Sequence, residues 1–168
     1  MRNKKLIIFS LISVLILVGL FYVFFSKKNK EVEWLYDKLG IQLPEETSIW
    51  FSDESYGALG DGYRLYIYQT NSEEMKELIR REKLNSWSKL PLPTELSGPL
   101  MEKIKGITSE KIAELLPLKV TKGYYTIRNS RTNGLIMGSD VYDFSYNNVI
   151  ISVINLEDNK IYFLSFDM

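Results

Sequence analysis

The 168-residue sequence contains no cysteine and no histidine. Without cysteine the chain cannot form a disulfide, a thiolate metal site or a thiol nucleophile. Without histidine it has no imidazole base, and so neither a Ser-His-Asp triad nor an ordinary zinc site. Any catalysis would have to use carboxylates, Ser/Lys pairs, tyrosine or a metal bound by oxygen atoms. A cysteine-free chain is compatible with either side of a membrane, so this absence does not indicate the compartment.

An excess of basic residues is also absent from the body of the chain. Six of the 21 basic residues flank an apolar run near the N-terminus, and all 21 acidic residues lie beyond position 30. The body therefore has 15 basic against 21 acidic residues, a net charge of −6. A negative body without a basic stripe repels phosphate backbones, so we exclude nucleic acid as a partner.

The one long apolar run covers residues 6–25 and contains no charged residue. Its 20 residues, at about 1.5 Å each, match a hydrocarbon core about 30 Å thick. The run is longer than the apolar core of a signal peptide and ends without a small-residue cleavage site, so we expect an uncleaved transmembrane helix. A cleaved signal peptide is the alternative.

The orientation of this helix is not fixed by its flanks, because three basic residues precede the run and three follow it. Single spans at an extreme N-terminus commonly act as signal-anchors. We therefore favour a single-pass cell-membrane protein with its N-terminus inside and its domain on the extracytoplasmic side.

The chain divides into a tail (1–5), the membrane anchor (6–25), a charged spacer (26–30) and one domain (31–168). Periodicity predicts helices over 31–39, over 71–84 and just after Thr108. Alternating β-rich runs predict strands over 47–52, 63–70, 124–128, 140–146, 149–156 and 161–166. Three prolines and Gly98 predict an extended connection over 85–100, and Asn133-Gly134 predicts a turn. The expected fold class is α+β, a small antiparallel sheet with helices packed on one face.

Five carboxylates are candidates for chemistry: Asp53, Glu54 and Asp61 on a glycine-containing connection, and Asp140 and Asp143 near a strand. Two that converge in a cleft could perform acid–base hydrolysis. In the alternative interpretation these residues have no catalytic role, because acidic residues in turns are usually solvated or cap backbone amides. Asp53, Glu54, Ser55 and Asp61 could supply oxygen to a cation, but the spacing of an EF-hand is absent.

Two further patterns are chance matches. The sequence SWSK at 86–89 fits S-x-x-K, but the companion motifs S-D-N and K-T-G are missing. The sequence GALGDG at 57–62 lacks the dinucleotide-binding spacing and precedes a strand, so it predicts a turn. We expect no cofactor and no metal.

Aromatic residues are abundant, with 11 Tyr, 8 Phe and 3 Trp. Alternation puts Arg64, Tyr66 and Tyr68 on one sheet face, with Tyr124 and Tyr142 as candidate neighbours. If helices leave this face uncovered, it forms a binding surface for a protein or a glycan. In the alternative interpretation these tyrosines cover the core.

The composition, rich in Lys, Asn and Ile behind a signal-anchor, resembles that of single-pass bacterial envelope proteins, although no family motif supports the resemblance. The leading hypothesis is a membrane-tethered, non-enzymatic interaction module of the cell envelope. It would contact the bilayer through residues 6–25 and a protein partner through the tyrosines. The alternative is a carboxylate-dependent hydrolase of envelope polymers. A scaffold that oligomerises through its aromatic face is a third reading.

Overall fold

A computed structural model describes residues 13–19, 36–57, 62–82, 84–132, 134–136 and 148–167. The chain forms two compact units, residues 1–42 and residues 43–168. The predicted strand over 140–146 lies outside the described residues, and so does most of the predicted membrane anchor.

In the first unit, residues 13–19 and 36–39 are helical. The second of these helical stretches ends at Gly40, whose backbone N–H donates to the Tyr36 carbonyl over 2.7 Å and whose φ is +67°. Glycine adopts this left-handed conformation more readily than residues with a Cβ, which is why the predicted C-terminal stop is correct. Among the helices of the described residues, none is both long enough and apolar enough to cross a membrane.

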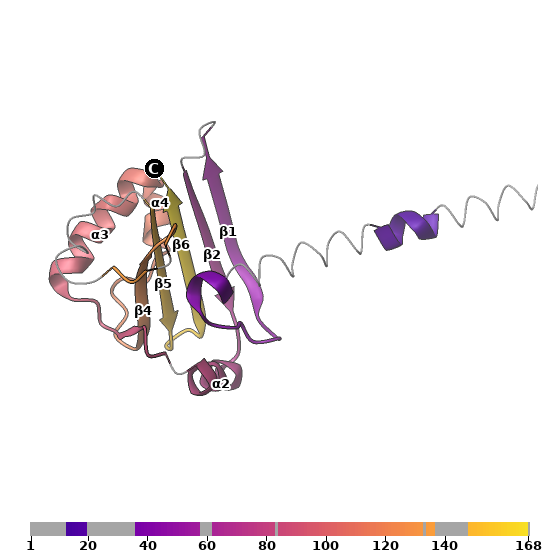
Figure 1. Cartoon of the computed structure of the whole chain (residues 1–168), viewed down its shortest axis with the longest axis horizontal. Helices are drawn as coiled ribbons and strands as arrows, with labels where there is room; N and C mark the ends of the chain where they lie inside the picture. The colour runs from indigo at the N-terminus through magenta and orange to yellow at the C-terminus, as the bar shows by residue number, and fades with distance from the viewer. Residues whose placement is uncertain are drawn as a thin grey trace, which may run out of the picture. The chain divides into compact units, whose positions relative to one another are not determined.

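The second unit contains a six-stranded, fully antiparallel sheet with the strand order β1-β2-β6-β5-β4-β3 (Figure 1). The strands are β1 (Ser48–Tyr56), β2 (Gly62–Gln69), β3 (Ser88–Lys89), β4 (Gly123–Asn129), β5 (Asn148–Asn155) and β6 (Lys160–Asp167). Strand β6 follows all the others in the chain but pairs between β2 and β5. The α+β class with an antiparallel sheet is therefore confirmed.

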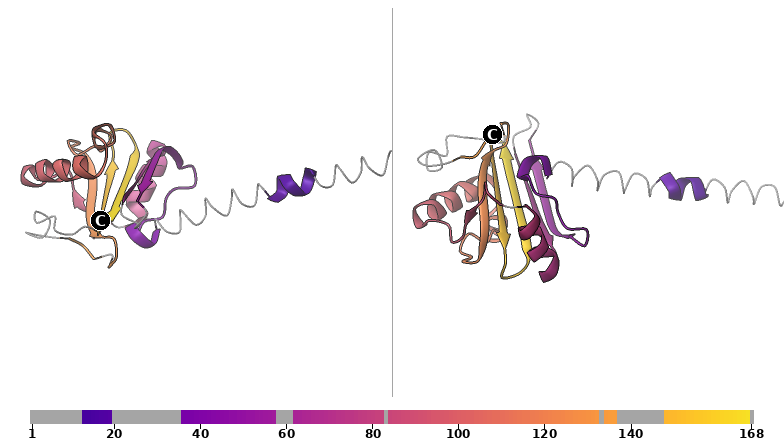
Figure 2. Two further views of the ribbon diagram at one scale, coloured as in Figure 1. Left: turned by 90° about the horizontal axis from the view of Figure 1, so that it is seen from above. Right: turned by 60° about the horizontal axis from the view of Figure 1, so that its bottom comes forward.

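Among the described residues of this unit, the helices that accompany the sheet are α2 (Ser72–Glu82), α3 (Thr94–Ile107) and α4 (Glu110–Glu114). The predicted N-cap of α2 is confirmed, because the Asn71 side-chain oxygen accepts from the backbone N–H groups of Glu73 and Glu74. Ser109 caps α4 in the same way. Helix α2 lies beside the end of the sheet at which β2 finishes (Figures 1 and 2).

The expectation of an extended connection over residues 85–100 is wrong for its second half, which belongs to α3. Pro93 precedes the helix and Pro99 lies within it. Leu96, Leu100 and Ile104 recur at four-residue intervals and are all buried. This apolar stripe outweighs the helix-breaking effect of the proline and forms the helix through its contacts with the sheet.

One face of the sheet packs against α3 and α4. Alternate residues of the strands, among them Leu65, Ile151 and Leu164, join Leu100 and Ile112 in a single hydrophobic cluster. We call this the helix-packed face. Helices α3 and α4 contribute to the cover of this face, whereas the buried Met75 and Leu78 of α2 do not belong to the cluster.

The opposite face, which we call the second face, carries the residues that alternate with these. It is also buried: Ile150, Ser152, Ile154, Ile161 and Phe163 have almost no solvent exposure. The sheet therefore buries apolar residues on both faces, so the central strands β5 and β6 read as nearly continuous hydrophobic runs.

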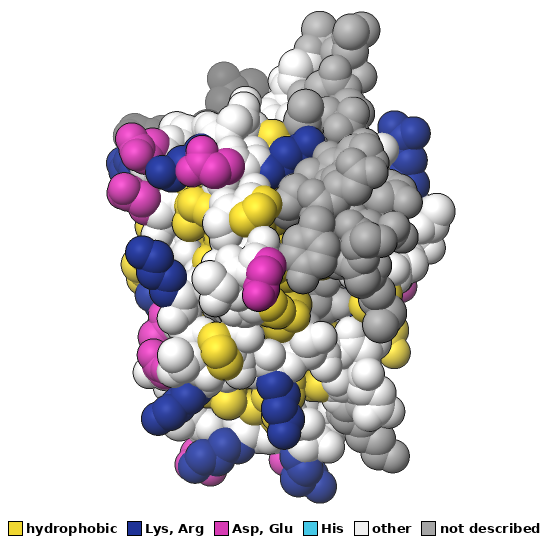
Figure 3. All heavy atoms as spheres, turned by 90° about the vertical axis from the view of Figure 1, so that its left-hand side faces the viewer, with side chains coloured by type: hydrophobic (Ala, Val, Ile, Leu, Met, Phe, Trp, Pro, Cys, Tyr) yellow, Lys and Arg dark blue, Asp and Glu magenta, His cyan; other side chains and the backbone are white. Residues whose placement is uncertain are grey.

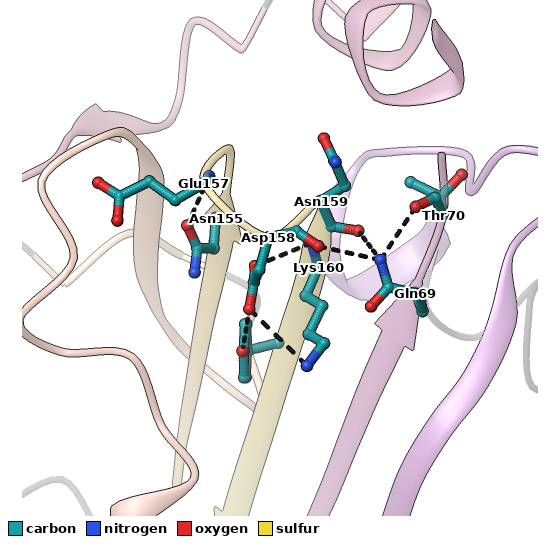
Figure 4. Close-up of polar contacts among 8 residues, drawn as sticks. Gln69, Thr70, Asn155, Glu157, Asp158, Asn159 and Lys160 are labelled. Atoms are coloured by element: carbon teal, nitrogen blue, oxygen red, sulfur yellow. Dashed lines mark hydrogen bonds and ion pairs between the residues drawn. The ribbon is translucent and has the colours of Figure 1, made fainter. Parts of the chain in front are cut away.

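The β5–β6 hairpin closes through a side-chain network at the end nearest α2 (Figure 4). The Asp158 side chain accepts from the Lys160 backbone N–H over 3.2 Å and from the Tyr162 hydroxyl over 3.0 Å. The Gln69 amide donates to the carbonyls of Asp158 and Asn159, and this joins the end of β2 to the turn. These bonds fix the register of the predicted hairpin, which the structure confirms.

Candidate binding surface

The tyrosines predicted to form a binding surface are placed as the alternation requires, on the second face of the sheet. Tyr66 and Tyr68 are neighbours on β2, with ring centroids 5.9 Å apart. However, Tyr66 is only 5% exposed and Tyr68 only 4%. The expectation of an open aromatic face therefore does not describe these two side chains, because β2 is an inner strand and the second face is buried as well.

Tyr124 does not join this pair. The registers place Tyr68 opposite Ile161, Ile161 opposite Ile154, and Ile154 opposite Tyr124. Tyr68 and Tyr124 thus lie in one row across the sheet, three strand spacings or about 14 Å apart. Two isoleucines separate them, and Tyr142 lies outside the described residues.

Arg64, the fifth candidate, belongs to a polar cluster at the β1–β2 edge. Its Nε lies 3.2 Å from Glu54 Oε1, and its guanidinium stands over the Tyr56 ring, 5.7 Å from the centroid. The Tyr66 hydroxyl donates to the same Glu54 carboxylate. Burial is the main cause that raises the pKa of Tyr56, and the nearby Arg64 charge partly opposes it.

Asp53 and Glu54 do not converge into a catalytic pair. They are consecutive residues of β1, so their side chains point to opposite faces of the sheet. Glu54 binds Arg64 and Tyr66 on the second face, whereas Asp53 Oδ2 accepts from the Tyr63 hydroxyl over 2.5 Å on the helix-packed face. A hydrolase would have to use Asp61, Asp140 or Asp143, which lie outside the described residues.

The chain does expose aromatic residues, but on β1 rather than on β2. Ile49, Trp50 and Tyr56 are 49%, 52% and 43% exposed. In the described part of residues 43–168, Leu135 is the other large hydrophobic residue with comparable exposure. We call β1 together with these three side chains, which project from the faces of the sheet, the β1 edge. It gathers apolar surface on the strand that ends the sheet.

Trp50 is the extra residue of a register shift, since Ile49 pairs with Tyr68 and Phe51 with Ile67. Its ring lies against Lys160, whose Nζ is 3.7 Å from the ring centroid. This cation–π contact holds an exposed tryptophan in a defined position. The signal in the sequence was the run Ile49-Trp50-Phe51, which breaks the alternation expected of a strand with one buried face.

Seen from the side of α3, the molecule carries acidic and basic side chains interspersed with small apolar areas (Figure 3). The large apolar side chains exposed on β1 therefore contrast in type with the mostly charged side chains on the side of α3. No group of three or more acidic residues in the described ranges could hold a metal ion. Ser86 of the S-x-x-K pattern accepts a hydrogen bond from Arg128 over 2.7 Å, which supports the view that the motif match is chance.

No protein-family model, curated protein or solved structure matches this chain.

Proposed function

We propose that this protein is a membrane-tethered, non-enzymatic interaction module of the cell envelope, and that it binds an extended segment of a protein partner along the β1 edge. The observation that carries the proposal is the exposure of Ile49, Trp50 and Tyr56 on the strand that ends the sheet. The proposed binding surface therefore lies on β1 and not on the buried tyrosines of the neighbouring strand β2.

An edge strand presents backbone N–H and C=O groups on its outer side, and an extended peptide can pair with them. Strand β1 is nine residues long, longer than the usual strand of five or six. Proteins usually blunt such an edge with lysine, proline or a very short strand. Strand β1 contains neither lysine nor proline. Its one register shift, which is also a protective device, lies near its start at Trp50, and residues 51–56 pair regularly with β2.

The side chains of β1 also define the chemistry of the partner. Ile49, Trp50 and Tyr56 would contact apolar residues, and Asp53 adds one carboxylate, since Glu54 is already paired with Arg64. A mainly apolar partner segment with a basic residue near Asp53 fits both features.

The membrane tether rests on the sequence. Residues 6–25 supply an apolar run of membrane length, and the short spacer 26–30 keeps the domain near the lipid. With the N-terminus inside, the β1 edge would meet partners on the extracytoplasmic side.

The test is site-specific photo-crosslinking in native membranes, with the probe at position 49, 50 or 56. We expect all three positions to crosslink to the same protein, and Ile49→Lys to reduce the crosslink at position 56 at least tenfold. Leu135→Lys is the matched control, because Leu135 is similarly exposed but lies away from β1. Crosslinks chiefly to a second copy of this chain would show self-association and contradict the proposal, as would equal losses in both variants.

A further inference from the structure

A second feature, independent of the β1 edge, is the buried arginine of β4. Arg128 is only 8% exposed, although it lies on a sheet face among hydroxyl and apolar side chains. Within the described part of the chain no carboxylate lies at ion-pair distance from it. Burial without a counter-charge lowers the pKa of Arg128 and is energetically unfavourable, and a bound anion would offset it.

The donors around Arg128 are not all used. Its Nη2 donates to Ser86 Oγ over 2.7 Å, but its Nε has no hydrogen-bond partner among the described residues. The fully buried Ser152 Oγ is equally without a partner in those ranges. Orphaned buried polar atoms of this kind are rare in folded proteins.

The register brings these two groups together. Ser152 pairs with Thr126, two residues before Arg128, so it is the diagonal neighbour of Arg128 on the second face. Diagonal neighbours have Cβ atoms about 7 Å apart, which is within reach of the long arginine side chain. Together, Arg128 Nε and the Ser152 hydroxyl can donate two hydrogen bonds to one planar acceptor.

The site also has a route to solvent. Ser86, which holds the guanidinium from one side, is itself exposed in the turn between α2 and β3. Among the described residues, strand β3 pairs with β4 only at Tyr124 and Tyr125. Further along β4, Arg128 pairs with Leu135 through an isolated β-bridge. The guanidinium therefore lies close to the lateral edge of the sheet.

We propose that Arg128 and Ser152 form a binding site for a carboxylate, supplied by a small organic acid or by the C-terminus of a peptide. A carboxylate matches the site because it carries one negative charge and accepts side by side from a guanidinium and a hydroxyl. A phosphate dianion matches it less well, since Arg128 is the site's one cation among the described residues and the body is net negative.

The experiment measures thermal unfolding of the full chain in mild detergent at pH 7, in sodium acetate and in sodium chloride of equal ionic strength. We expect acetate to raise Tm saturably by about 5 °C over chloride. Arg128→Met should abolish this rise. Arg64→Met is the matched control, because Arg64 lies in the same row of the second face but pairs with Glu54, and it should retain the rise.

Ser152→Ala should weaken acetate binding about tenfold, which corresponds to the loss of one hydrogen bond to a charged group. Line broadening of 13C-labelled acetate by the unmodified protein, reversed by unlabelled acetate but not by chloride, gives a second readout that needs no variant. A tripeptide with a free C-terminal carboxylate, compared with its amide, shows whether a peptide end can be the source.

The proposal would be overturned by an equal effect of chloride, by a larger effect of phosphate than of acetate, or by an acetate response that survives in Arg128→Met. The double variant Asp140→Asn/Asp143→Asn should leave the response unchanged. If this variant shows a larger acetate response than the unmodified protein, the chain's own carboxylates neutralise Arg128. The site is then not one for an external ligand.

Discussion

Tyr63 shows how a single hydrogen bond sets the titration of a side chain. Its ring lies in the core, and its hydroxyl donates to Asp53 near the sheet edge. This bond, with burial as the smaller cause, raises the pKa of Tyr63 to about 12. The protonated hydroxyl is thus the form that the fold stabilises.

The raised pKa predicts a loss of stability at high pH. Below pH 10 Tyr63 is protonated in both states, so its contribution is complete. Between pH 10 and about 12 the unfolded chain loses the proton while the folded chain keeps it, and the free energy of unfolding falls. Tyr63→Phe should lower stability by about 1 kcal/mol at pH 8 and flatten the decline above pH 10. Urea unfolding at pH 8, 10 and 12 measures the free energy of unfolding and its decline with pH. If the free energies of the two proteins declined in parallel above pH 10, the prediction would be wrong.

The candidate residues show what alternation can and cannot predict. A period of two correctly assigned Arg64, Tyr66 and Tyr68 to one face of β2. It could not show that this face is also buried, because that depends on segments far away in the chain. Tyrosine suits both buried and exposed positions, so the residue type also could not show whether this face is buried. The exposed set on β1 was missed because exposure follows from the position of the strand in the sheet.

At the scale of elements, local signals predicted those elements whose hydrogen bonds are local. The Asn71 cap of α2 and the turn between β5 and β6 were evident from a few adjacent residues. Helix α3 was missed because three prolines and a glycine obscured its apolar stripe. That stripe forms a helix only when the sheet covers it, and the tertiary contact outweighs the local preference.

This account of α3 predicts a strong dependence on its buried stripe. Leu100→Ala should lower the free energy of unfolding by about 2–5 kcal/mol, because Leu100 is fully buried between the helix and the sheet. Glu102→Ala, on the exposed side of the same helix, should change it by less than about 0.5 kcal/mol. Chemical unfolding of both variants provides the measurement; similar small effects would mean that packing does not hold α3 in place.

At the scale of the whole molecule, the chain combines an apolar N-terminal run with a domain that has its own core. Residues 43–168 form a compact unit with a continuous hydrophobic cluster. Nothing in the composition of that unit requires lipid. The proposed anchoring role is therefore assigned to residues 6–25.

Deletion of residues 1–30 tests this division. We expect the shortened chain to move from the carbonate-resistant membrane pellet to the supernatant and to keep its β-rich circular dichroism. Replacement of residues 6–25 by an unrelated transmembrane helix should restore the pellet fraction. A deleted chain that remains in the pellet, while still folded, would show that a second part of the protein holds the lipid.

The place of β6 in the sheet has a consequence for folding. Along the chain β1 and β2 come first and β4 and β5 later, and these two pairs belong to one sheet only because residues 160–167 pair between them. The pairing of β2 with β6 joins residues 91 to 105 positions apart, a long loop to close. Until β6 pairs with β2, the inner edge of β2 is open to other strands, a state that favours aggregation. The joining of the two halves of the sheet thus depends on one strand.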